Sequence, residues 1–162
     1  MTGLRRFLII ATVLAGTMLT VQQSQAAYRQ YYSSWNYHPQ RSYYYRTYYY
    51  KPQPTYTSYN YHYCIHYPSR PRYVYYYNPH SRHYWGRFDL EGTNGEQYSI
   101  LAEEDRKGTL AEIPESAFPA PAAMPVIPEA EDGEQVAPPE GVPGQDVPEG
   151  EPAAEGDAPA GN

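Results

Sequence analysis

The chain has 162 residues, and its formal net charge at pH 7 is −6. It contains 21 tyrosines and 17 prolines, whereas Leu, Ile, Val and Phe are scarce after residue 26; such a composition argues against a large aliphatic core. All 18 acidic residues lie at or after Asp89, which is more typical of interaction segments than of one evenly mixed globular surface. We therefore expect a mostly disordered, low-complexity chain with one small folded patch.

Residues 1–26 have the order of a secretory signal peptide, which predicts an N-terminal signal helix that is cleaved. Arg5 and Arg6 precede the apolar run Phe7–Val21, and polar residues follow it. The run is shorter than the roughly 20 apolar residues that a membrane span needs, so cleavage after Ala26 is favoured over an uncleaved anchor. We expect export to the periplasm, the cell wall or the extracellular space, with no membrane span after cleavage.

Residues 27–71 form a basic, tyrosine-rich segment of low complexity. All tyrosines except Tyr98 lie between Tyr28 and Tyr84, and no acidic residue occurs there. Prolines interrupt the segment, so no long helix is expected. Stretches such as "SYNYHY" alternate aromatic and polar residues with the period of a strand. We expect extended chain with local strand or polyproline character.

The sequence "HYCIH" lies within this segment. In a strand, His62, Cys64 and His66 project from one face, and imidazole and thiolate groups are ligands for zinc or copper. Three ligands on one short strand rarely complete a coordination shell. We therefore expect no cofactor and keep a copper or zinc site at these residues as an alternative. Cys64 is the only cysteine, so it either forms an intermolecular disulfide or remains a free thiol.

Residues 72–116 form the passage that most resembles a folded module. "YWGRFDLE" and "QYSIL" flank "GTNG", where Asn94 and Gly95 suit the positive φ angles of a tight turn. Residues 73–77 supply a third strand. The pattern predicts an antiparallel β-hairpin or a three-stranded sheet around residues 72–101. We expect a ligand-binding surface there, formed by Tyr76, Trp85, Phe88 and Tyr98.

Residues 117–162 are rich in Pro, Ala, Gly and Glu. Proline removes backbone donors and the acidic groups repel one another, so this segment is predicted to be a disordered tail. The spacing of Pro125 and Pro128 matches a polyproline ligand, but no arginine flanks it. A plain spacer is therefore favoured.

The chain lacks the local signatures of the common enzyme classes. No Ser, His and Asp set stands in a recognisable context, and no glycine-rich phosphate loop follows a strand. We therefore expect a non-enzymatic protein. Basic and aromatic residues together would suit single-stranded nucleic acid, but export argues against that partner.

The stretches "YYYRTYYYKP", "YNYHYC", "RPRYVYYYNP" and "IPESAFP" resemble the exported tyrosine-rich hypothetical proteins of planctomycete bacteria. The resemblance covers residues 43–128. It implies a bacterial exported protein, and it implies that the predicted hairpin is a feature of the family. These proteins have no assigned activity, so no functional residue is implied.

These observations predict a structural or adhesive protein of the cell envelope that is cohesive through tyrosine and arginine contacts. Cation–π contacts contribute about 0.5–1 kcal/mol each when exposed, and many of them on one chain act together. The expected partners are other copies of the chain or an anionic envelope polymer or polysaccharide. Two alternatives remain, namely a small envelope-binding module built on the hairpin and a His/Cys metal-binding protein.

Overall fold

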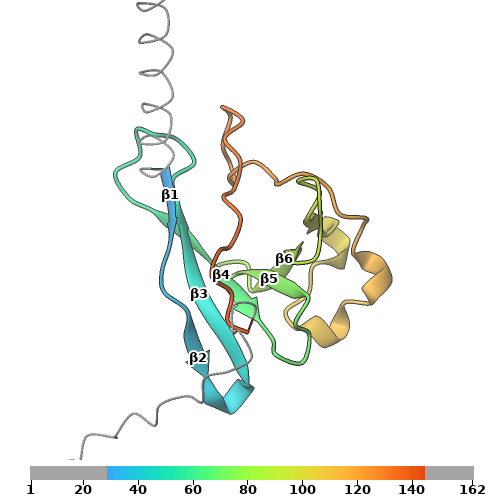
Figure 1. Ribbon diagram of the computed structural model, residues 1–162. Coiled ribbons are helices and arrows are strands. Elements are labelled where there is room, and N and C mark those ends of the chain that lie inside the picture. The colour runs from blue at the N-terminus through green and yellow to red at the C-terminus, as the bar shows by residue number, and fades with distance from the viewer. Residues whose placement is uncertain (1–28, 145–162) are drawn as a thin grey trace, which may run out of the picture.

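The computed structural model describes residues 29–144, which form a twisted antiparallel sheet of seven strands (Figure 1). The strand order is β1-β3-β4-β5-β6-β7, and β2 pairs with β3 along the same edge as β1. The strands are β1 (Gln30–Tyr32), β2 (Asn36–His38), β3 (Tyr43–Tyr50), β4 (Asn60–His66), β5 (Tyr73–Asn78), β6 (His83–Asp89) and β7 (Tyr98–Ile100). The short 3-10 helices are η1 (Pro39–Arg41), η2 (Glu103–Asp105), η3 (Leu110–Glu112) and η4 (Glu115–Ala117).

The strands form because aromatic side chains favour a pleated, half-buried surface, and the prolines mark the connections between strands. Pro39 lies in η1, and each of the other prolines before residue 80 falls between two strands of the meander β3–β6. The turn between β6 and β7 contains Asn94 and Gly95 with φ angles of 61° and 77°, as the sequence predicts. Proline thus interrupts the segment without preventing a sheet, because it avoids ladder positions.

The expectation of a mostly disordered, low-complexity chain is wrong. The three strands predicted around residues 72–101 are present as β5, β6 and β7, but they are only one end of the sheet. β4 pairs with β5 directly, so the sheet continues from residues 72–116 into residues 27–71. The signal segment, residues 1–26, and the end of the tail, residues 145–162, lie outside the described residues.

Several buried tyrosine hydroxyls of the core have hydrogen-bond partners, whereas the buried hydroxyl of Tyr98 has none. Tyr48 donates to Oε1 of Gln30 at 2.8 Å. Tyr32 donates to the carbonyl oxygen of Ala137 at 2.6 Å, and its hydroxyl lies 3.1 Å from that of Tyr76. Burying such a hydroxyl without a partner costs free energy, so these contacts make a core of aromatic rings possible.

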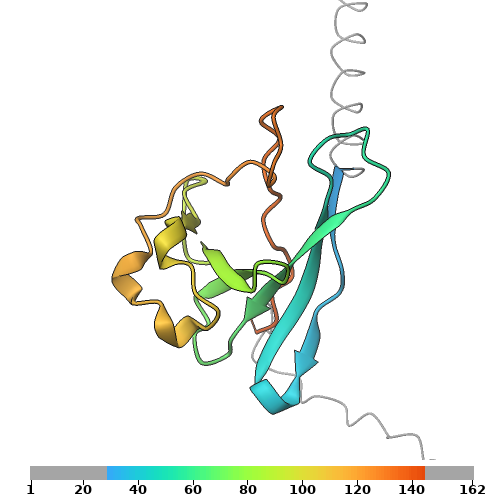
Figure 2. The same ribbon diagram turned by 180° about the vertical axis from the view of Figure 1, so that it is seen from behind.

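The expectation of a disordered tail is wrong for residues 119–144, which we call the strap. The strap crosses one face of the sheet (Figures 1 and 2). Its apolar residues Ile127, Val136 and Val142 are buried against tyrosines of β3 and β5. Its Asp132 forms an ion pair with the buried Arg29. This proline-rich, acidic segment is therefore ordered by apolar packing and by an ion pair with the basic N-terminal part of the described chain.

The other face of the sheet is covered by the segment 101–118, which carries η2, η3 and η4 and lies beside β5 and β6 (Figure 1). Leu101, Ile113 and Phe118 form a second core with Tyr75 and Tyr84. Arg87 reaches the same core, because its guanidinium lies 3.9 Å from the Tyr73 ring centroid and pairs with Glu115 at 2.6 Å. This cover leaves the β3 and β4 part of the face open.

Candidate functional site: an open face of tyrosine rings

The uncovered part of the sheet carries a row of partly exposed tyrosines, which we call the tyrosine face. Strand alternation and the pairing of β3 with β4 bring these rings to the same side. Neighbouring ring centroids lie 5.8–6.4 Å apart between Tyr49, Tyr61, Tyr63 and Tyr45. The residues of the tyrosine face are Tyr43, Tyr45, Tyr49, Tyr61 and Tyr63.

The row continues at both ends. Tyr31 of β1 stacks on Tyr49 with a centroid distance of 4.8 Å and is 45% exposed. At the other end, Tyr67 packs edge-on against Tyr43 at 5.4 Å. Aromatic rings in such geometry are held by their neighbours, so the face is a preformed surface of rings along β3 and β4.

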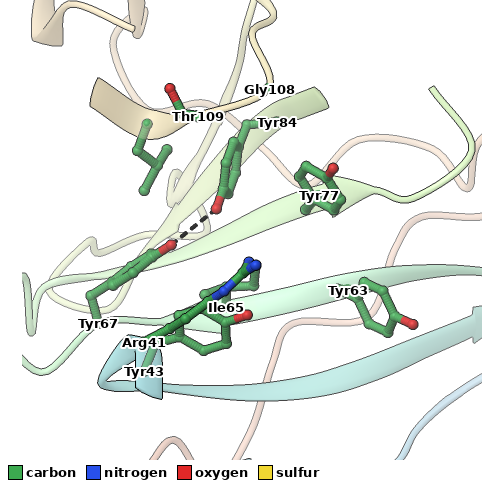
Figure 3. Close-up of a pocket in the computed structure, with 10 residues that line it drawn as sticks. Arg41, Tyr43, Tyr63, Ile65, Tyr67, Tyr77, Tyr84, Gly108 and Thr109 are labelled. Atoms are coloured by element: carbon green, nitrogen blue, oxygen red, sulfur yellow. Dashed lines mark hydrogen bonds between the residues drawn. The ribbon is translucent and has the colours of Figure 1, made fainter. Parts of the chain in front are cut away.

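A cavity of about 410 Å³ opens where the tyrosine face meets the cover (Figure 3). This volume lies within the range of sites that bind small molecules. Five of its ten lining residues are tyrosines, and Arg41 carries the only charge among the ten. The lining residues are Arg41, Tyr43, Tyr63, Ile65, Tyr67, Tyr77, Tyr84, Gly108, Thr109 and Leu110.

The polar groups of this cavity are positioned by local structure. Ser42 adopts a left-handed conformation with φ 50° at the end of η1, and the Arg41 side chain then lies over Tyr43 and Ile65 (Figure 3). The hydroxyls of Tyr67 and Tyr84 are hydrogen-bonded to each other at 3.0 Å. A smaller cavity of about 130 Å³, lined by His38 and Tyr45 among others, continues along the tyrosine face.

Three tyrosines of the cavity, Tyr63, Tyr67 and Tyr84, have raised pKa values and so stay neutral at physiological pH. Burial raises the pKa of Tyr67, although the hydrogen bond from Tyr84 and the charge of Arg41 act in the opposite direction. Burial likewise raises the pKa of Tyr63 and of Tyr84. Each neutral hydroxyl offers one donor and two acceptor positions, so the cavity combines flat apolar rings, neutral hydrogen-bonding groups and one cation.

The four aromatic residues predicted as a ligand surface do come together, but inside the sheet's other core. Tyr76 lies 5.2 Å from Trp85 and 5.3 Å from Tyr98 between ring centroids, and Phe88 pairs with Tyr98 in the β6–β7 ladder. All four are buried under the strap side of the sheet. They hold the fold, and none of them is more than 8% exposed to solvent.

The residues His62, Cys64 and His66 project from one face of β4, as predicted, and that face is buried. Burial lowers the pKa of His62 to about 4, with the charges of His80 and His83 adding to the effect. His66 donates from Nδ1 to the carbonyl oxygen of Tyr73 at 3.0 Å. Within residues 29–144, no group of three His, Cys, Asp or Glu side chains is placed to hold a metal ion.

The thiol of Cys64 is also enclosed. Its exposed fraction is 0%, and burial strongly raises its pKa. Cys64 pairs with Tyr76 across β4 and β5 in the middle of the sheet. An intermolecular disulfide at Cys64 would therefore require local opening of these strands.

Sequence reasoning missed the residues of the cavity. Tyr43 begins the run "YYYRTYYY", in which neighbouring rings face opposite sides of the sheet, whereas Tyr63, Tyr67 and Tyr84 stand singly between other residue types. The useful signal was the alternation in "YYYRTYYY" and "YNYHYCIH", which fixes which rings share a face once the register is known. The role of Arg41 depends on the turn at Ser42, for which the sequence offers no strong signal.

Comparison of the chain with protein-family models, with curated proteins and with solved structures gives no match. None of these comparisons bears on the resemblance to exported planctomycete proteins. Within residues 29–144, no helix is both long and apolar enough to cross a membrane. The assignment of a function therefore rests on the arrangement of the tyrosine face and its cavity.

Proposed function

We propose that the protein is a non-enzymatic, exported adhesive protein of the cell envelope whose tyrosine face binds an envelope polysaccharide. The observation that carries this proposal is the uncovered row of rings along β3 and β4. A large exposed aromatic patch marks an interaction site more often than an inert surface. Sugar rings have an apolar face and a rim of hydroxyls, which matches rings that carry phenolic hydroxyls.

The arrangement favours a long polymer over a single small ligand. Tyr31, Tyr49, Tyr61 and Tyr63 follow one another at centroid distances of 4.8–6.2 Å, so consecutive sugars can contact consecutive rings. Each contact is weak, but several contacts to one polymer add up. The expected N-terminal signal peptide would bring the chain to the compartment where such polymers are found.

Contacts between tyrosine and basic residues support the fold of this protein. Arg46 lies over the Tyr32 ring at 4.4 Å and over the Trp35 ring at 5.2 Å from the centroids. Arg87 lies between Tyr73 and Phe118. Since these cations are engaged inside one molecule, we propose adhesion to a polysaccharide ahead of cohesion between disordered chains.

The test is co-sedimentation of the secreted chain with insoluble, protein-free polysaccharide from the envelope of the producing cells. Combined substitution of Tyr45, Tyr61 and Tyr63 by serine should weaken binding by about tenfold or more, because each aromatic contact contributes about 0.5–1.5 kcal/mol. The matched control replaces Tyr37 and Tyr44, a ring pair on the opposite face at 4.9 Å, and should bind like wild type. Equal binding by both variants would refute the proposal.

A further inference from the structure

We infer that the cavity at the end of the tyrosine face binds an acidic sugar, with the carboxylate at Arg41 and the pyranose ring against the tyrosines. This inference rests on the proposed function and specifies the class of polysaccharide. Arg41 is the one charged residue among the ten that line the cavity, and the other nine are tyrosine, isoleucine, leucine, threonine and glycine residues. A carboxylate that enters therefore meets a cation in the wall; the carboxylate of Glu112, which accepts a hydrogen bond from the lining Thr109, is not itself a lining group.

The position of the guanidinium suits a group that is bound flat along the rings. Arg41 extends over Tyr43 and Ile65, and the Tyr67 and Tyr84 rings stand across from it (Figure 3). Arginine binds a carboxylate through two parallel hydrogen bonds when it is free to do so. In a uronic acid, the carboxylate is attached to the rim of the pyranose ring, so both parts can be held at once.

The neutral hydroxyls recognise the rest of the sugar. The Tyr67 and Tyr84 hydroxyls use one donor on each other at 3.0 Å, which leaves one donor and free acceptor positions for a ligand. The Thr109 hydroxyl donates to Oε2 of Glu112 at 2.7 Å and retains acceptor capacity. A sugar presents several hydroxyls to such groups, whereas an acidic peptide side chain presents only its carboxylate.

Two features of the cavity favour one unit of an acidic polysaccharide over a folded acidic partner. The cavity of about 410 Å³ is too small for a folded partner and suits one or two sugar units. It opens onto the tyrosine face, because it shares Tyr43, Tyr63 and Ile65 with the smaller cavity beside it. A polymer that lies along the tyrosine face can therefore place one acidic unit next to Arg41 without leaving the sheet.

The experiment measures binding of the secreted chain to oligomers of α-1,4-linked galacturonic acid by calorimetry at low salt. The matched ligand is the same oligomer with its carboxyl groups methyl-esterified, and poly-glutamate supplies carboxylates without sugar rings. The variants are Arg41→Gln and, as a control, Arg70→Gln. Arg70 is exposed and lines a separate cavity that also holds Glu115.

We expect Arg41→Gln to weaken binding of the acidic oligomer about tenfold, and methyl esterification to weaken binding to wild type by a similar factor. The two changes together should cost no more than either alone, because both remove the same contact. Arg70→Gln should bind like wild type. Equal affinity of wild type for the acidic and the esterified oligomer overturns the inference, as does equal binding of poly-glutamate.

These results are distinguishable from failure of the proposed function. If wild type binds acidic and esterified oligomers equally and the serine variant of Tyr45, Tyr61 and Tyr63 loses both, polysaccharide binding stands and the role of Arg41 is refuted. If that serine variant retains all binding to the envelope polysaccharide, the proposed function fails, and this inference, which rests on it, fails too.

Discussion

Substitution of Ile127 by alanine tests whether the strap is part of the fold. Ile127 is 0% exposed and packs in the core that contains Tyr48 and Tyr76. Its backbone N–H donates to the carbonyl oxygen of Glu134 at 2.8 Å, which holds the side chain in place. Removing a buried aliphatic side chain in this way costs about 2–5 kcal/mol, a large fraction of the roughly 5–15 kcal/mol that stabilises a domain.

The matched control is the neighbouring Val126→Ala, because Val126 is 47% exposed and surface changes cost about 0.5 kcal/mol or less. Urea unfolding followed by tryptophan fluorescence gives the free energy of unfolding for both variants. We expect a clearly lower midpoint for Ile127→Ala and a midpoint close to wild type for Val126→Ala. If both variants unfold like wild type, the strap does not pack against the sheet and the reasoning is wrong.

Three further predictions concern the buried side of the sheet. Gly86→Ala should destabilise the protein in urea unfolding, since a Cβ there would lie 2.6 Å from the hydroxyl oxygen of Tyr98 and 2.8 Å from the carbonyl oxygen of Ser99; unchanged stability would contradict this packing. Burial lowers the pKa of His62 to about 4 from an ordinary value of 6.5, so the unfolded chain takes up a proton first as pH falls. Between pH 6.5 and 4 the wild type should therefore lose stability by up to about 1.4 kcal/mol per pH unit more than His62→Gln, and parallel pH profiles would count against a buried neutral imidazole. The Cys64 thiol, which is fully buried, should react with a thiol-specific dye only after urea is added, and rapid labelling of the native protein would show that β4 and β5 open readily.

The hairpin end of the sheet was predictable because its signals are local. Asn94 and Gly95 adopt the positive φ angles of a turn, and the alternation on either side sets the β6–β7 register in which Phe88 faces Tyr98. A few residues specify such a turn without help from the rest of the chain. This local signal does not predict that the sheet continues beyond β5 into β4, β3, β2 and β1.

The packing of the strap against the first strands was not predictable, because the contacts that order it join distant parts of the chain. The hydroxyl of Tyr32 donates to Ala137, and the side chain of Gln30 bonds the backbone of Gln135 and of Ala137. The strap therefore satisfies tyrosine and glutamine groups of the first strands. Composition alone indicates disorder here, since it counts aliphatic residues and cannot count such partners.

The opposite charges of the two halves acquire a structural explanation from these contacts. Basic Arg29 pairs with Asp132, Arg72 with Asp89 and Arg87 with Glu115. Each pair joins the front of the chain to its acidic part. The first pair holds the strap and the third holds the cover, so the charge asymmetry helps to bring these segments onto the two faces of one sheet, whereas the Arg72–Asp89 pair joins residues at the ends of β5 and β6.

The same residue type serves the interior and the proposed binding surface, and this explains why the candidate site was hidden in the sequence. In β3, Tyr48 is fully buried under the strap while Tyr49, the next residue, lies on the tyrosine face. Leucines at the exposed positions would leave an apolar sheet surface that is prone to aggregation. Tyrosine keeps the ring for packing and adds a hydroxyl that water or a sugar can satisfy. Tyrosine can thus supply both the buried and the partly exposed rings of one sheet. The cover, residues 101–118, sets where the open part of the face begins.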